Sequence, residues 1–517
     1  MRSRSAYAAF GVLATLVGMG AGHLVAAFTS PASSPVLAVG SAVIDRTPVP
    51  LAQWAIRTFG AADKAILIGS VIVGVLLLAG LAGVLARRRF VLGAALLVVL
   101  VAIAAAAALT NAGAGAVDVV PAVATAVVGV AALALLDRLA RRARPATAAD
   151  DGAARSASPS PGVGRRGVLL GAGSMVVLAA ALAGAGRLVG RLRSAPADVT
   201  LPAAAQPLPA LPAGLERTYP DITPLQVPNE DFYRVDTRLD VPIVDVEDWT
   251  LTIDGDVDQE VVLTFDDIAA MELIERDITL TCVSNSVGGE FVGGARWLGV
   301  PLMSLLQMAG IDNTKADQLF STDVDGMTIS TPFELATDGR DAMLAIGMNG
   351  EPLPREHGFP ARMVIPGLYG MISATKWIER ITLTTYAAQE AYWTQRDWAT
   401  DAPIKPSARI DTPQGLPEEV APGEVIVGGV AWAQTRGGVA KIEVKVDDGG
   451  WEEAELGPDV DNDYWRQWFY RWDATPGLHS VAARVTDGDG EPQITEVAQP
   501  FPEGSSGIHL LQISVSD

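Results

Sequence analysis

Five long apolar stretches before residue 190 constrain this chain more than any other feature of its sequence. They run through about residues 6–28, 65–86, 90–110, 119–136 and 167–186. Each is close to the ~20 residues that a helix needs to cross the hydrocarbon core of a bilayer. We therefore predict a five-helix transmembrane region over residues 1–190, and a multi-pass protein of the cell membrane.

Arginines flank these stretches, and they predict the direction in which the helices run. The arginines before the first stretch, between the second and third, after the fourth and before the fifth all fall on one side: Arg2, Arg4, Arg87, Arg88, Arg89, Arg138, Arg141, Arg142, Arg144, Arg165 and Arg166. Cytoplasmic loops carry an excess of Lys and Arg. We therefore expect a cytoplasmic N-terminus and an extracytoplasmic region from residue 190 onward.

Ionisable side chains inside the spans would indicate a transport path or haem ligation. His23 is the candidate of this kind within the five stretches, and a single histidine does not supply two haem ligands. The spans consist largely of Ala, Val, Leu and Gly, and the small residues among these let helices pack closely. We interpret the region as a membrane anchor.

The segments that connect these parts are polar or proline-rich. Residues 140–166 contain the run PATAADDGAARSASPSPGVG, whose composition predicts a cytoplasmic linker without a packed core. Arg165 and Arg166 open the fifth stretch, either as a twin-arginine export signal retained as a helix or as ordinary cytoplasmic anchors. Residues 191–228 are rich in proline and predict an extended extracytoplasmic tether.

The charge of the chain divides into two unlike halves. Residues 1–200 hold 18 basic and 7 acidic residues, whereas residues 201–517 hold 20 basic and 52 acidic residues. Nucleic-acid binding requires a basic face. The acidic second half therefore argues against a nucleic-acid partner and suits a soluble region outside the cell.

Cys282 is the one cysteine in the chain. A single cysteine excludes an intramolecular disulfide framework, and it excludes a zinc or iron–sulfur site built only from cysteines of this chain. A lone cysteine is most often a small buried hydrophobe, so its neighbours in the sequence decide whether it has a chemical role.

Residues 229–404 alternate between strand and helix patterns. WTLTIDG (249–255) and ERDITLTCV (275–283) have the two-residue period and the β-branched residues of strands. PLMSLLQMAGI (301–311) has the pattern of a short amphipathic helix that ends at Gly310. This mixture of strands and short helices predicts an α+β domain.

Four blocks of this region follow one another in a recognisable order. They are NEDFYRVDT (229–237), LTCVSNSVGGEFVGGARWLGVPL (280–302), NGEPLPREHGFPARMVIPGLYG (349–370) and KWIERI (376–381). Together they resemble the successive blocks of the sulfite-oxidase family of molybdopterin-dependent oxidoreductases, here in a membrane-anchored bacterial form. The resemblance covers residues 229–517 and implies a sulfite-oxidase-type molybdopterin domain over residues 229–404.

The resemblance implies a molybdenum ion held by the dithiolene of one pyranopterin and by one protein thiolate, which would be Cys282. Soft sulfur ligands suit a metal that changes oxidation state, and coordination itself deprotonates the thiol. The glycines that follow Cys282 allow a backbone to approach a bulky group closely. Trp297 matches a family tryptophan near the substrate pocket; core packing is the alternative for it.

Basic residues in the later blocks match the positions that anchor the cofactor phosphate in this family. They are His357, Arg362 and Lys376, and the planar fork of an arginine suits phosphate oxygens. The alternative is a set of surface ion pairs. Thr375, next to Lys376, would add a backbone or hydroxyl contact to the cofactor.

Further cofactor-binding residues are implied in two other blocks. Tyr233 and Arg234 match the segment that lines the pterin and the metal, and Arg234 would also orient the substrate as a catalytic residue. Thr322 in LFSTDVDG matches the position of a residue that contacts the cofactor in the family. Asp323 or Asp325 is the alternative for that position.

This sequence also departs from the family pattern. Animal and plant sulfite oxidases follow the ligand cysteine with an Asn-Arg-Arg run, whereas Asn285 is followed here by Ser286 and Val287. The active-site tyrosine of the family is matched by Trp398 in WTQRDW. Fewer cations attract a dianion less strongly. Sulfite is therefore doubtful as the substrate, and a neutral sulfoxide is a rival.

Residues 405–517 predict a second outer domain. Short alternating segments such as GEVIVGGVAW and AKIEVKV are separated by Gly/Asp turns at roughly ten-residue spacing, which is typical of an antiparallel sandwich. The segment resembles the immunoglobulin-like dimerisation domain of the family, which implies an all-β sandwich and a homodimer. Trp465, Trp468 and Trp472 are expected in its core or interface.

The sequence as a whole predicts an extracytoplasmic molybdenum oxidoreductase. It would transfer an oxygen atom to or from a small sulfite-like or sulfoxide-like substrate, and exchange electrons with a separate carrier such as a cytochrome or a quinone-linked subunit. The alternative is a non-enzymatic, membrane-anchored surface protein that binds a partner through a degenerate molybdopterin domain.

Overall fold

The computed structural model describes residues 3–48, 51, 54–55, 58–59, 63–110, 114–142, 165–193 and 199–517. The chain divides into two compact units. One is Met1–Ala195 with Thr237–Ile243, and the other is Pro196–Asp236 with Val244–Asp517. Most of the predicted cytoplasmic linker, residues 143–164, lies outside the described residues, as do the side chains of Arg165 and Arg166.

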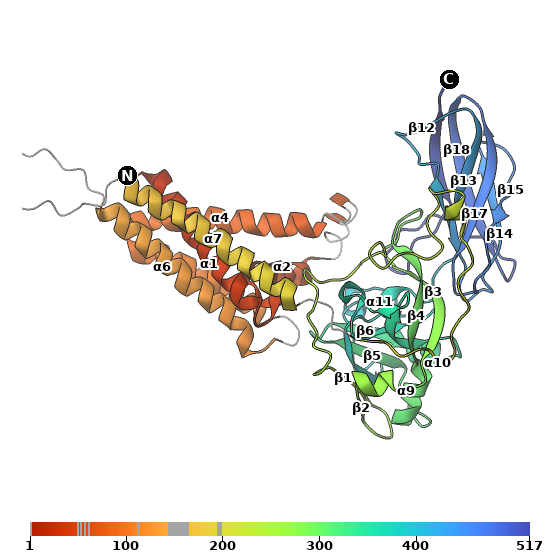
Figure 1. Cartoon of the computed structure of the whole chain (residues 1–517), viewed down its shortest axis with the longest axis horizontal. Helices are drawn as coiled ribbons and strands as arrows, with labels where there is room; N and C mark the ends of the chain where they lie inside the picture. The colour runs from red at the N-terminus through yellow and green to blue at the C-terminus, as the bar shows by residue number, and fades with distance from the viewer. Residues whose placement is uncertain are drawn as a thin grey trace, which may run out of the picture. The chain divides into compact units, whose positions relative to one another are not determined.

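The first unit is built from helices (Figure 1). Their bounds are Arg4–Ala26 (α1), Pro35–Arg46 (α2), Asp63–Arg88 (α4), Phe90–Ala108 (α5), Val120–Arg142 (α6) and Arg165–Arg193 (α7). Within the described residues, 5 helices are long and apolar enough to cross a membrane, and they coincide with the predicted stretches. The short α2 was not predicted.

Helix α1 packs against α4, α6 and α7, so it forms the centre of the helical unit. Glycines allow this packing. A Cβ atom added at Gly83 of α4 would lie 1.9 Å from the carbonyl oxygen of Tyr7, and one added at Gly11 would lie 1.9 Å from that of Ala79. Small residues in spanning helices let backbones approach closely, and these glycines have that role here.

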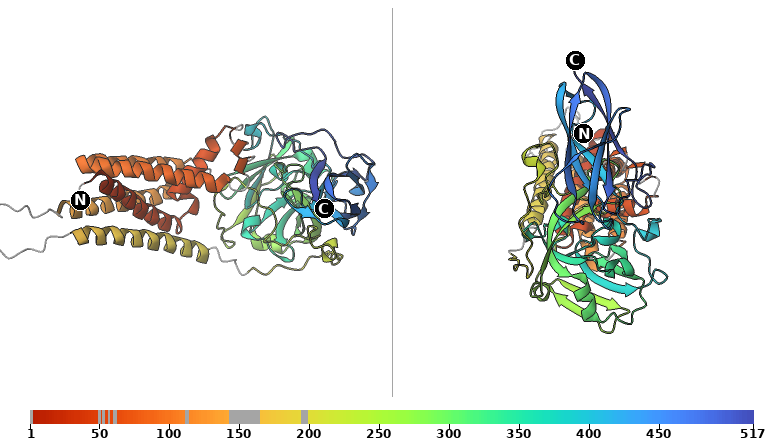
Figure 2. Two further views of the ribbon diagram at one scale, coloured as in Figure 1. Left: turned by 90° about the horizontal axis from the view of Figure 1, so that it is seen from above. Right: turned by 90° about the vertical axis from the view of Figure 1, so that its right-hand side faces the viewer.

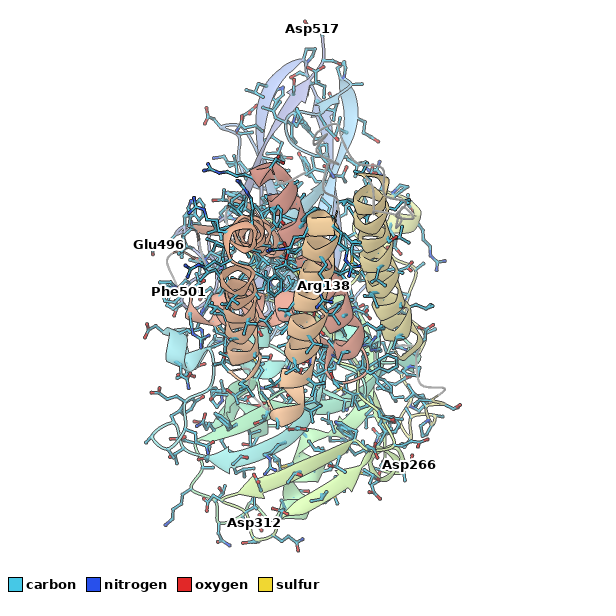
Figure 3. The ribbon with its side chains drawn as sticks, turned by 90° about the vertical axis from the view of Figure 1, so that its left-hand side faces the viewer. Arg138, Asp266, Asp312, Glu496, Phe501 and Asp517 are labelled. Carbon is cyan, nitrogen blue, oxygen red and sulfur yellow. The ribbon has the colours of Figure 1, made fainter. Side chains whose placement is uncertain are left out.

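A buried carboxylate at the end of α6 was not recognised from the sequence. Asp137 accepts a hydrogen bond from the Tyr7 hydroxyl at 2.8 Å and pairs with Arg141 one turn later at 2.6 Å. It is 6% exposed and lies beside Arg138, which is labelled on α6 in Figure 3. The helix extends beyond the predicted end of the span, so Asp137 belongs to its packed terminus.

Two sheets form the α+β domain of the second unit. The first has the order β2-β1-β10-β5-β6, and the second has the order β3-β4-β7-β8 with β9 paired to β7. The bounds are Thr250–Gly255 (β1), Val261–Thr264 (β2), Ile274–Thr281 (β3), Val292–Pro301 (β4), Gln318–Asp323 (β5), Thr328–Pro332 (β6), Met343–Met348 (β7), Glu351–Pro352 (β8), Arg362–Val364 (β9) and Ile378–Thr384 (β10).

Short helices complete this domain: Phe265–Ala269 (α8), Leu302–Ala309 (α9), Phe333–Thr337 (α10) and Gly370–Ser373 (α11). The predicted strands near residues 249–255 and 275–283 are β1 and β3. The predicted helix over residues 301–311 is α9, and Gly310 ends it with a φ of 77°, a conformation that glycine adopts without strain.

The last part of the chain is a β-sandwich, whose blue strands run side by side in the right-hand view of Figure 2. One sheet has the order β11-β13-β17-β16 and the other β12-β19-β18-β14-β15. The bounds are Ser407–Thr412 (β11), Glu419–Val420 (β12), Gly423–Trp432 (β13), Val439–Val446 (β14), Glu452–Glu453 (β15), Glu455–Leu456 (β16), Arg466–Ala474 (β17), Gly477–Asp487 (β18) and His509–Val515 (β19).

Three tryptophans of this region divide between two cores. Trp468 and Trp472 lie in the core between the two sheets of the sandwich, with Val481 and Ile513. Trp465 instead packs in the core of the α+β domain, and its indole N–H donates to the Leu225 carbonyl at 2.7 Å. The sandwich and the α+β domain therefore share a packed boundary within the second unit.

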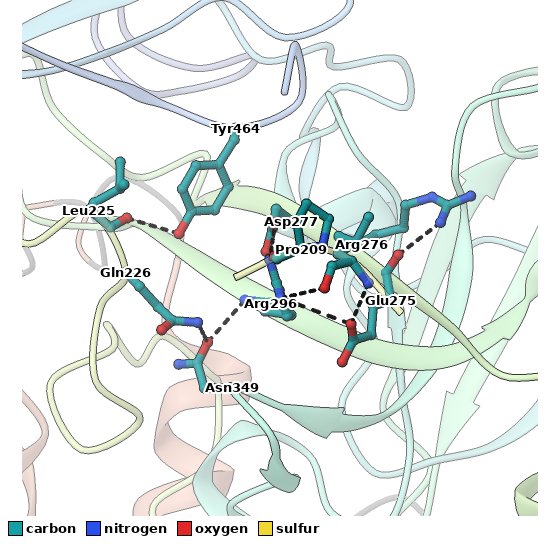
Figure 4. Close-up of polar contacts among 10 residues, drawn as sticks. Pro209, Leu225, Gln226, Glu275, Arg276, Asp277, Arg296, Asn349 and Tyr464 are labelled. Carbon is teal, nitrogen blue, oxygen red and sulfur yellow. Dashed lines mark hydrogen bonds and ion pairs between the residues drawn. The ribbon is translucent and has the colours of Figure 1, made fainter. Parts of the chain in front are cut away.

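The described part of the proline-rich segment, residues 199–228, lies along this unit rather than apart from it. Arg296 of β4 donates to the Pro209 carbonyl at 2.8 Å and forms an ion pair with Asp277 at 2.8 Å (Figure 4). The Tyr464 hydroxyl donates to the Leu225 carbonyl at 2.8 Å. Backbone groups of an extended segment need such partners when they are buried.

Candidate functional site

Cys282 begins a loop that connects β3 to β4. Its backbone N–H donates to the Phe291 carbonyl at 2.9 Å, and its own carbonyl accepts from the Asn285 N–H at 3.0 Å. The Asn285 side-chain oxygen accepts from the Phe291 N–H at 2.9 Å. We call residues 282–291 the cysteine loop; it is closed at its base and tied across its middle by Asn285.

The glycines of the cysteine loop make this closure possible. A Cβ atom added at Gly289 would lie 2.4 Å from the Asn285 side-chain oxygen, so only glycine leaves room for that side chain. Gly288 has a φ of 74°, which residues with a Cβ rarely adopt. These glycines accommodate Asn285, whose role was not recognised from the sequence, and their predicted approach to the cofactor stays a prediction.

The Cys282 thiol is partly exposed, and its sulfur lies 2.9 Å from the Ser284 hydroxyl. Burial raises the pKa of the thiol, while the Ser284 hydrogen bonds and the charge of Lys376 oppose that rise. A bound metal ion would lower the pKa of the thiol instead, because coordination deprotonates a thiol outright. The role of Cys282 as a metal ligand stays a prediction, and the raised pKa of the thiol does not favour a free nucleophile.

Arg362, the first residue of β9, is buried. Its Nη1 donates to the His357 carbonyl at 3.1 Å, and its guanidinium lies 5.0 Å from the centre of the Trp297 ring. Burial lowers the pKa of Arg362 to about 10. In the part of the chain that the structure describes, no carboxylate lies in ion-pair range of this guanidinium. Such a group calls for an anion from outside the chain, because an unpaired buried charge is costly.

His357 ends the 3-10 turn Arg355–His357 and is also buried. Its Nε2 lies 2.9 Å from the Asn229 carbonyl, which can only accept a hydrogen bond, so Nε2 carries the proton. Burial lowers the pKa of His357 to about 4, and the charges of Arg362 and Lys376 add to this. His357 is therefore neutral near pH 7 and presents Nδ1 as an acceptor.

Lys376 and Arg234 share one carboxylate. Asp236 Oδ2 accepts from Arg234 Nε at 2.7 Å and pairs with Lys376 Nζ at 3.2 Å. Burial lowers the pKa of Lys376 to about 8, and Asp236 opposes that shift. Asp236 was not recognised as a site residue from its sequence context, although it lies within the first matched block.

A glycine holds the basic residues together. Gly358 has a φ of 114°, and a Cβ atom there would lie 3.1 Å from Arg362 Cβ and 3.1 Å from the Cα and Cβ of Lys376. The positive φ favours glycine, and a Cβ atom would fit only if these neighbours moved. Arg362 and Lys376 pair with each other in an isolated antiparallel bridge, and Gly358 lies directly against both of them.

Tyr233 links the cations to the cysteine. Burial raises the pKa of its hydroxyl, Cys282 raises it further, and Arg362 opposes the shift, so both groups lie within electrostatic reach of this hydroxyl. The ring stacks on Phe232 with centroids 5.2 Å apart. Phe232 in turn makes an edge contact with His357 at 5.5 Å. Residues from four separate blocks thus meet at one site.

Thr375 lies in this region, and its predicted contact with the cofactor stays a prediction. Its hydroxyl is buried and lies 2.5 Å from the hydroxyl of Ser321. Thr322 is the next residue of β5, and successive side chains of a strand point to opposite faces. The structure therefore brings Ser321, not Thr322, to Thr375, and the cofactor role of Thr322 stays a prediction.

The two tryptophans singled out in the sequence have different surroundings. Trp297 is fully buried, donates from its indole to the Ile278 carbonyl at 3.1 Å and supports Arg362. Trp398 is partly buried and makes edge contacts with Trp393, at 5.9 Å, and with Phe501, at 5.2 Å. Trp297 therefore packs against the buried Arg362, whereas Trp398 forms an aromatic cluster with Trp393 and Phe501.

Comparison with known proteins identifies this part of the chain. Residues 238–393 match the family described as the oxidoreductase molybdopterin binding domain. Mitochondrial sulfite oxidase of Drosophila melanogaster is 30% identical over 290 residues, which cover 47% of this chain and 50% of that protein. The human enzyme is 30% identical over 310 residues, covering 50% and 56%. Residues 238–393 form a molybdopterin-binding oxidoreductase domain of the sulfite-oxidase family.

The matched regions are partial. The chain spans about half the length of the curated relatives it matches, 50% of the fly protein and 56% of the human protein. Among solved structures, that of the sulfane dehydrogenase SoxCD from Paracoccus pantotrophus aligns at 22% identity with a TM-score of 0.49, covering 56% of this chain and 80% of that chain. The family match weighs against the alternative of a surface protein without enzymatic activity.

The residues of the sulfite-oxidase-family domain fit a molybdenum–pyranopterin group. Thr281, directly before Cys282, has a buried hydroxyl without a hydrogen-bond partner among the described residues. The buried guanidinium of Arg362 suits a phosphate, and planar bidentate contacts are the strongest that an arginine makes. A hollow of about 810 Å³ lies beside this cluster, with Phe232, Arg234 and His357 in its lining.

These residues would hold different parts of the cofactor. Arg362 and Lys376 would bind the phosphate, and Cys282 would supply the protein thiolate. His357 was also predicted to anchor the phosphate, but its neutral Nδ1 is an acceptor and would instead face a hydrogen-bond donor of the cofactor. When bound, molybdenum supplies the exchange of an oxo group with a substrate. Arg362 and Lys376 would also shield the phosphate from water, because the Arg362 residue is 5% exposed and the Lys376 side chain is 11% exposed.

Proposed function

We propose that this protein is a membrane-anchored molybdenum oxidoreductase that transfers an oxygen atom to or from a small neutral substrate of the sulfoxide class. The observation that carries the proposal is the meeting of the cysteine loop with the buried basic residues. The Phe291 ring of the loop lies 6.4 Å from the Tyr233 ring, and Phe232 next to Tyr233 contacts the Trp297 ring that lies under Arg362. Arg362 in turn pairs with Lys376 in an isolated bridge. A thiolate for the metal and cations for the phosphate are the two fixed contacts that the cofactor needs.

The charges around Cys282 favour a neutral substrate over the sulfite dianion. Lys376 is the cation whose charge acts on the Cys282 thiol, and Asp236 neutralises much of it. Arg234, which would orient the substrate, pairs with the same carboxylate. Ser286 and Val287 follow Asn285 in the cysteine loop, so no further cation stands there. A dianion gains little from a site whose cations are already paired.

An aromatic cluster near the cysteine loop also suits an apolar substrate. Trp398 contacts Phe501, and the backbone of Ala399 donates to the Pro502 carbonyl at 3.2 Å. Three residues after Pro502, the Ser505 hydroxyl donates to the Asn285 carbonyl of the cysteine loop at 2.6 Å. Methyl groups of a sulfoxide would pack on such rings, whereas a hydrated dianion would have to shed its water.

The positive-inside pattern of the arginines supports a cytoplasmic N-terminus and an extracytoplasmic catalytic domain. The proposed divisions are 1–190 for the membrane region, 229–404 for the molybdopterin domain and 405–517 for an immunoglobulin-like dimerisation domain. Residues 191–228 connect the first two, and their described part packs on the second unit. Among the described residues, no group of three or more His, Cys, Asp or Glu side chains is placed to hold a further metal ion. We therefore propose that a separate cytochrome or quinone-linked subunit exchanges the electrons.

Steady-state kinetics test this function. The purified, cofactor-loaded protein would be assayed as a reductase with dimethyl sulfoxide and methionine sulfoxide, using a reduced viologen as donor, and as an oxidase with sulfite, using ferricyanide as acceptor. We expect kcat/KM for a sulfoxide to exceed that for sulfite by at least tenfold. Efficient sulfite oxidation with negligible sulfoxide reduction would overturn the substrate assignment and leave the cofactor assignment intact.

A further inference from the structure

The β-sandwich contacts the cysteine loop directly, through two carbonyl groups on the loop's outer side. The Ser505 hydroxyl donates to the Asn285 carbonyl at 2.6 Å, and Arg409 Nη1 donates to the Gly289 carbonyl at 3.1 Å. The interior of the loop is tied by its own Asn285 side chain. The cysteine loop is therefore held from within by the Asn285 side chain and from outside by Ser505 and Arg409 of the sandwich.

Arg409 is a fixed donor rather than a mobile surface side chain. It is 8% exposed, its Nε pairs with Asp411 at 2.6 Å and its Nη2 donates to the Thr223 hydroxyl at 2.7 Å. Asp411 also accepts from the Thr223 backbone at 3.0 Å. The planar guanidinium makes three contacts in one orientation, so the position of Gly289 is set with little freedom.

Ser505 is held in a similar way by the segment around it. The carbonyl of the preceding Gly504 accepts from Lys405 Nζ at 2.9 Å. A Cβ atom added at Gly504 would lie 2.5 Å from the Tyr369 ring, so this backbone lies directly against the α+β domain. The Ser505 hydroxyl thus reaches Asn285 from a backbone that two other contacts already fix.

His509 covers the glycines of the loop. A Cβ atom added at Gly288 would lie 2.3 Å from His509 Nε2, and His509 Nδ1 accepts from the Ile410 N–H at 3.0 Å. The ring is therefore held by β11 and lies against the bend of the loop. Two segments of the sandwich, one with Arg409 and the other with Ser505 and His509, therefore converge on the ten residues of the cysteine loop.

We propose that Ser505 and Arg409 of the sandwich are positioning residues for the metal ligand Cys282, so that the sandwich completes the metal site rather than only joining two copies of the chain. This role rests on the proposed function, in which Cys282 binds molybdenum. Neither residue touches the metal. Each fixes a carbonyl of the loop, and the loop geometry sets the direction of the thiolate.

The test uses the full chain with Ser505→Ala and, as a matched control, Ser506→Ala. The Ser506 hydroxyl donates to the Glu496 carbonyl at 2.8 Å, which is a comparable hydrogen bond within the sandwich. Ser505→Thr keeps a hydroxyl and serves as the rescue. Hydrogen exchange of the cysteine loop is measured in cofactor-free protein from a host without molybdopterin, and cofactor retention is measured in loaded protein.

We expect Ser505→Ala to speed amide exchange in residues 282–291 by roughly fivefold, as the loss of one hydrogen bond implies. The rate of cofactor loss should rise in the same protein, while Ser506→Ala matches the unsubstituted chain and Ser505→Thr restores slow exchange. Unchanged loop exchange, or faster exchange with unchanged cofactor retention, would overturn the positioning role. Absence of molybdenum from the unsubstituted chain would instead overturn the proposed function, so the two failures are distinguishable.

Discussion

Lys376 Nζ lies 3.2 Å from Asp236 Oδ2, and that single oxygen also accepts a hydrogen bond from Arg234 at 2.7 Å. One carboxylate therefore offsets both Arg234 and Lys376, of which Lys376 is the cation that acts on the Cys282 thiol. The site keeps enough positive charge for a phosphate, through the separately buried Arg362, but offers little to a second anion. The Asp236 carboxylate should therefore influence how strongly the site binds sulfite.

Asp236→Asn should improve the binding of sulfite. Removal of the shared carboxylate leaves Arg234 and Lys376 with unopposed charge, and we expect KM for sulfite to fall by roughly threefold to tenfold at pH 7. KM for dimethyl sulfoxide should not change, because a neutral substrate does not respond to the added charge. Asp231→Asn, which removes an exposed carboxylate from the same segment, is the control. An equal change in both KM values would contradict the account.

Arg362→Met should separate stability from cofactor binding. An unpaired buried charge is costly, so replacing the Arg362 guanidinium by an apolar side chain should not destabilise the fold. We expect the denaturant midpoint of cofactor-free protein to stay the same or rise, while the cofactor content of protein from a competent host falls to near zero. Arg380→Met removes an exposed partner of Asp254 and should leave both quantities unchanged. Loss of stability together with full cofactor content would refute the phosphate role.

His357 should make the cofactor-free protein sensitive to acid. Its pKa in the folded state is about 4, below the ordinary value of 6.5, so the unfolded state binds more protons between these pH values. Stability should therefore fall as the pH drops from 6.5 to 4, by up to about 3 kcal/mol from this group. His357→Gln should remove that part of the slope in denaturant titrations at several pH values. An unaltered slope would show that His357 titrates normally.

Cys282→Ser should abolish turnover while leaving the fold intact. The side chain is partly exposed and its hydrogen bond to Ser284 can be kept by a hydroxyl, so the thermal midpoint should move by less than about 3 °C. The serine hydroxyl is a poor replacement for a soft thiolate, and kcat should fall by at least a hundredfold. Retained turnover would remove the ligand assignment.

The sequence predicted those parts of the molecule that depend on local pattern. The five apolar helices, the strands β1 and β3 and the end of α9 at Gly310 all follow from periodicity and turn residues close together in the chain. Cys282, His357, Arg362 and Lys376 were identified because each lies in a recognisable block. The structure brings these four residues together.

Contacts between distant segments were not predictable in the same way. Asp236 appeared as an ordinary carboxylate, and only the fold places it beside Lys376, 140 positions away. Ser321 reaches Thr375 because β5 turns that face inward, while Thr322 next to it faces the other way. The contact of Ser505 with the cysteine loop spans 220 positions. Composition and periodicity carry no information on such pairs.

The central claim is that Cys282 and the basic cluster hold a molybdenum–pyranopterin group. The most direct measurement is the molybdenum and pterin content of the full chain, purified from a host that makes molybdopterin. The account predicts about one molybdenum ion and one pterin per chain, and near-complete loss of both in Arg362→Met protein. Unsubstituted protein that contains neither molybdenum nor pterin would contradict it.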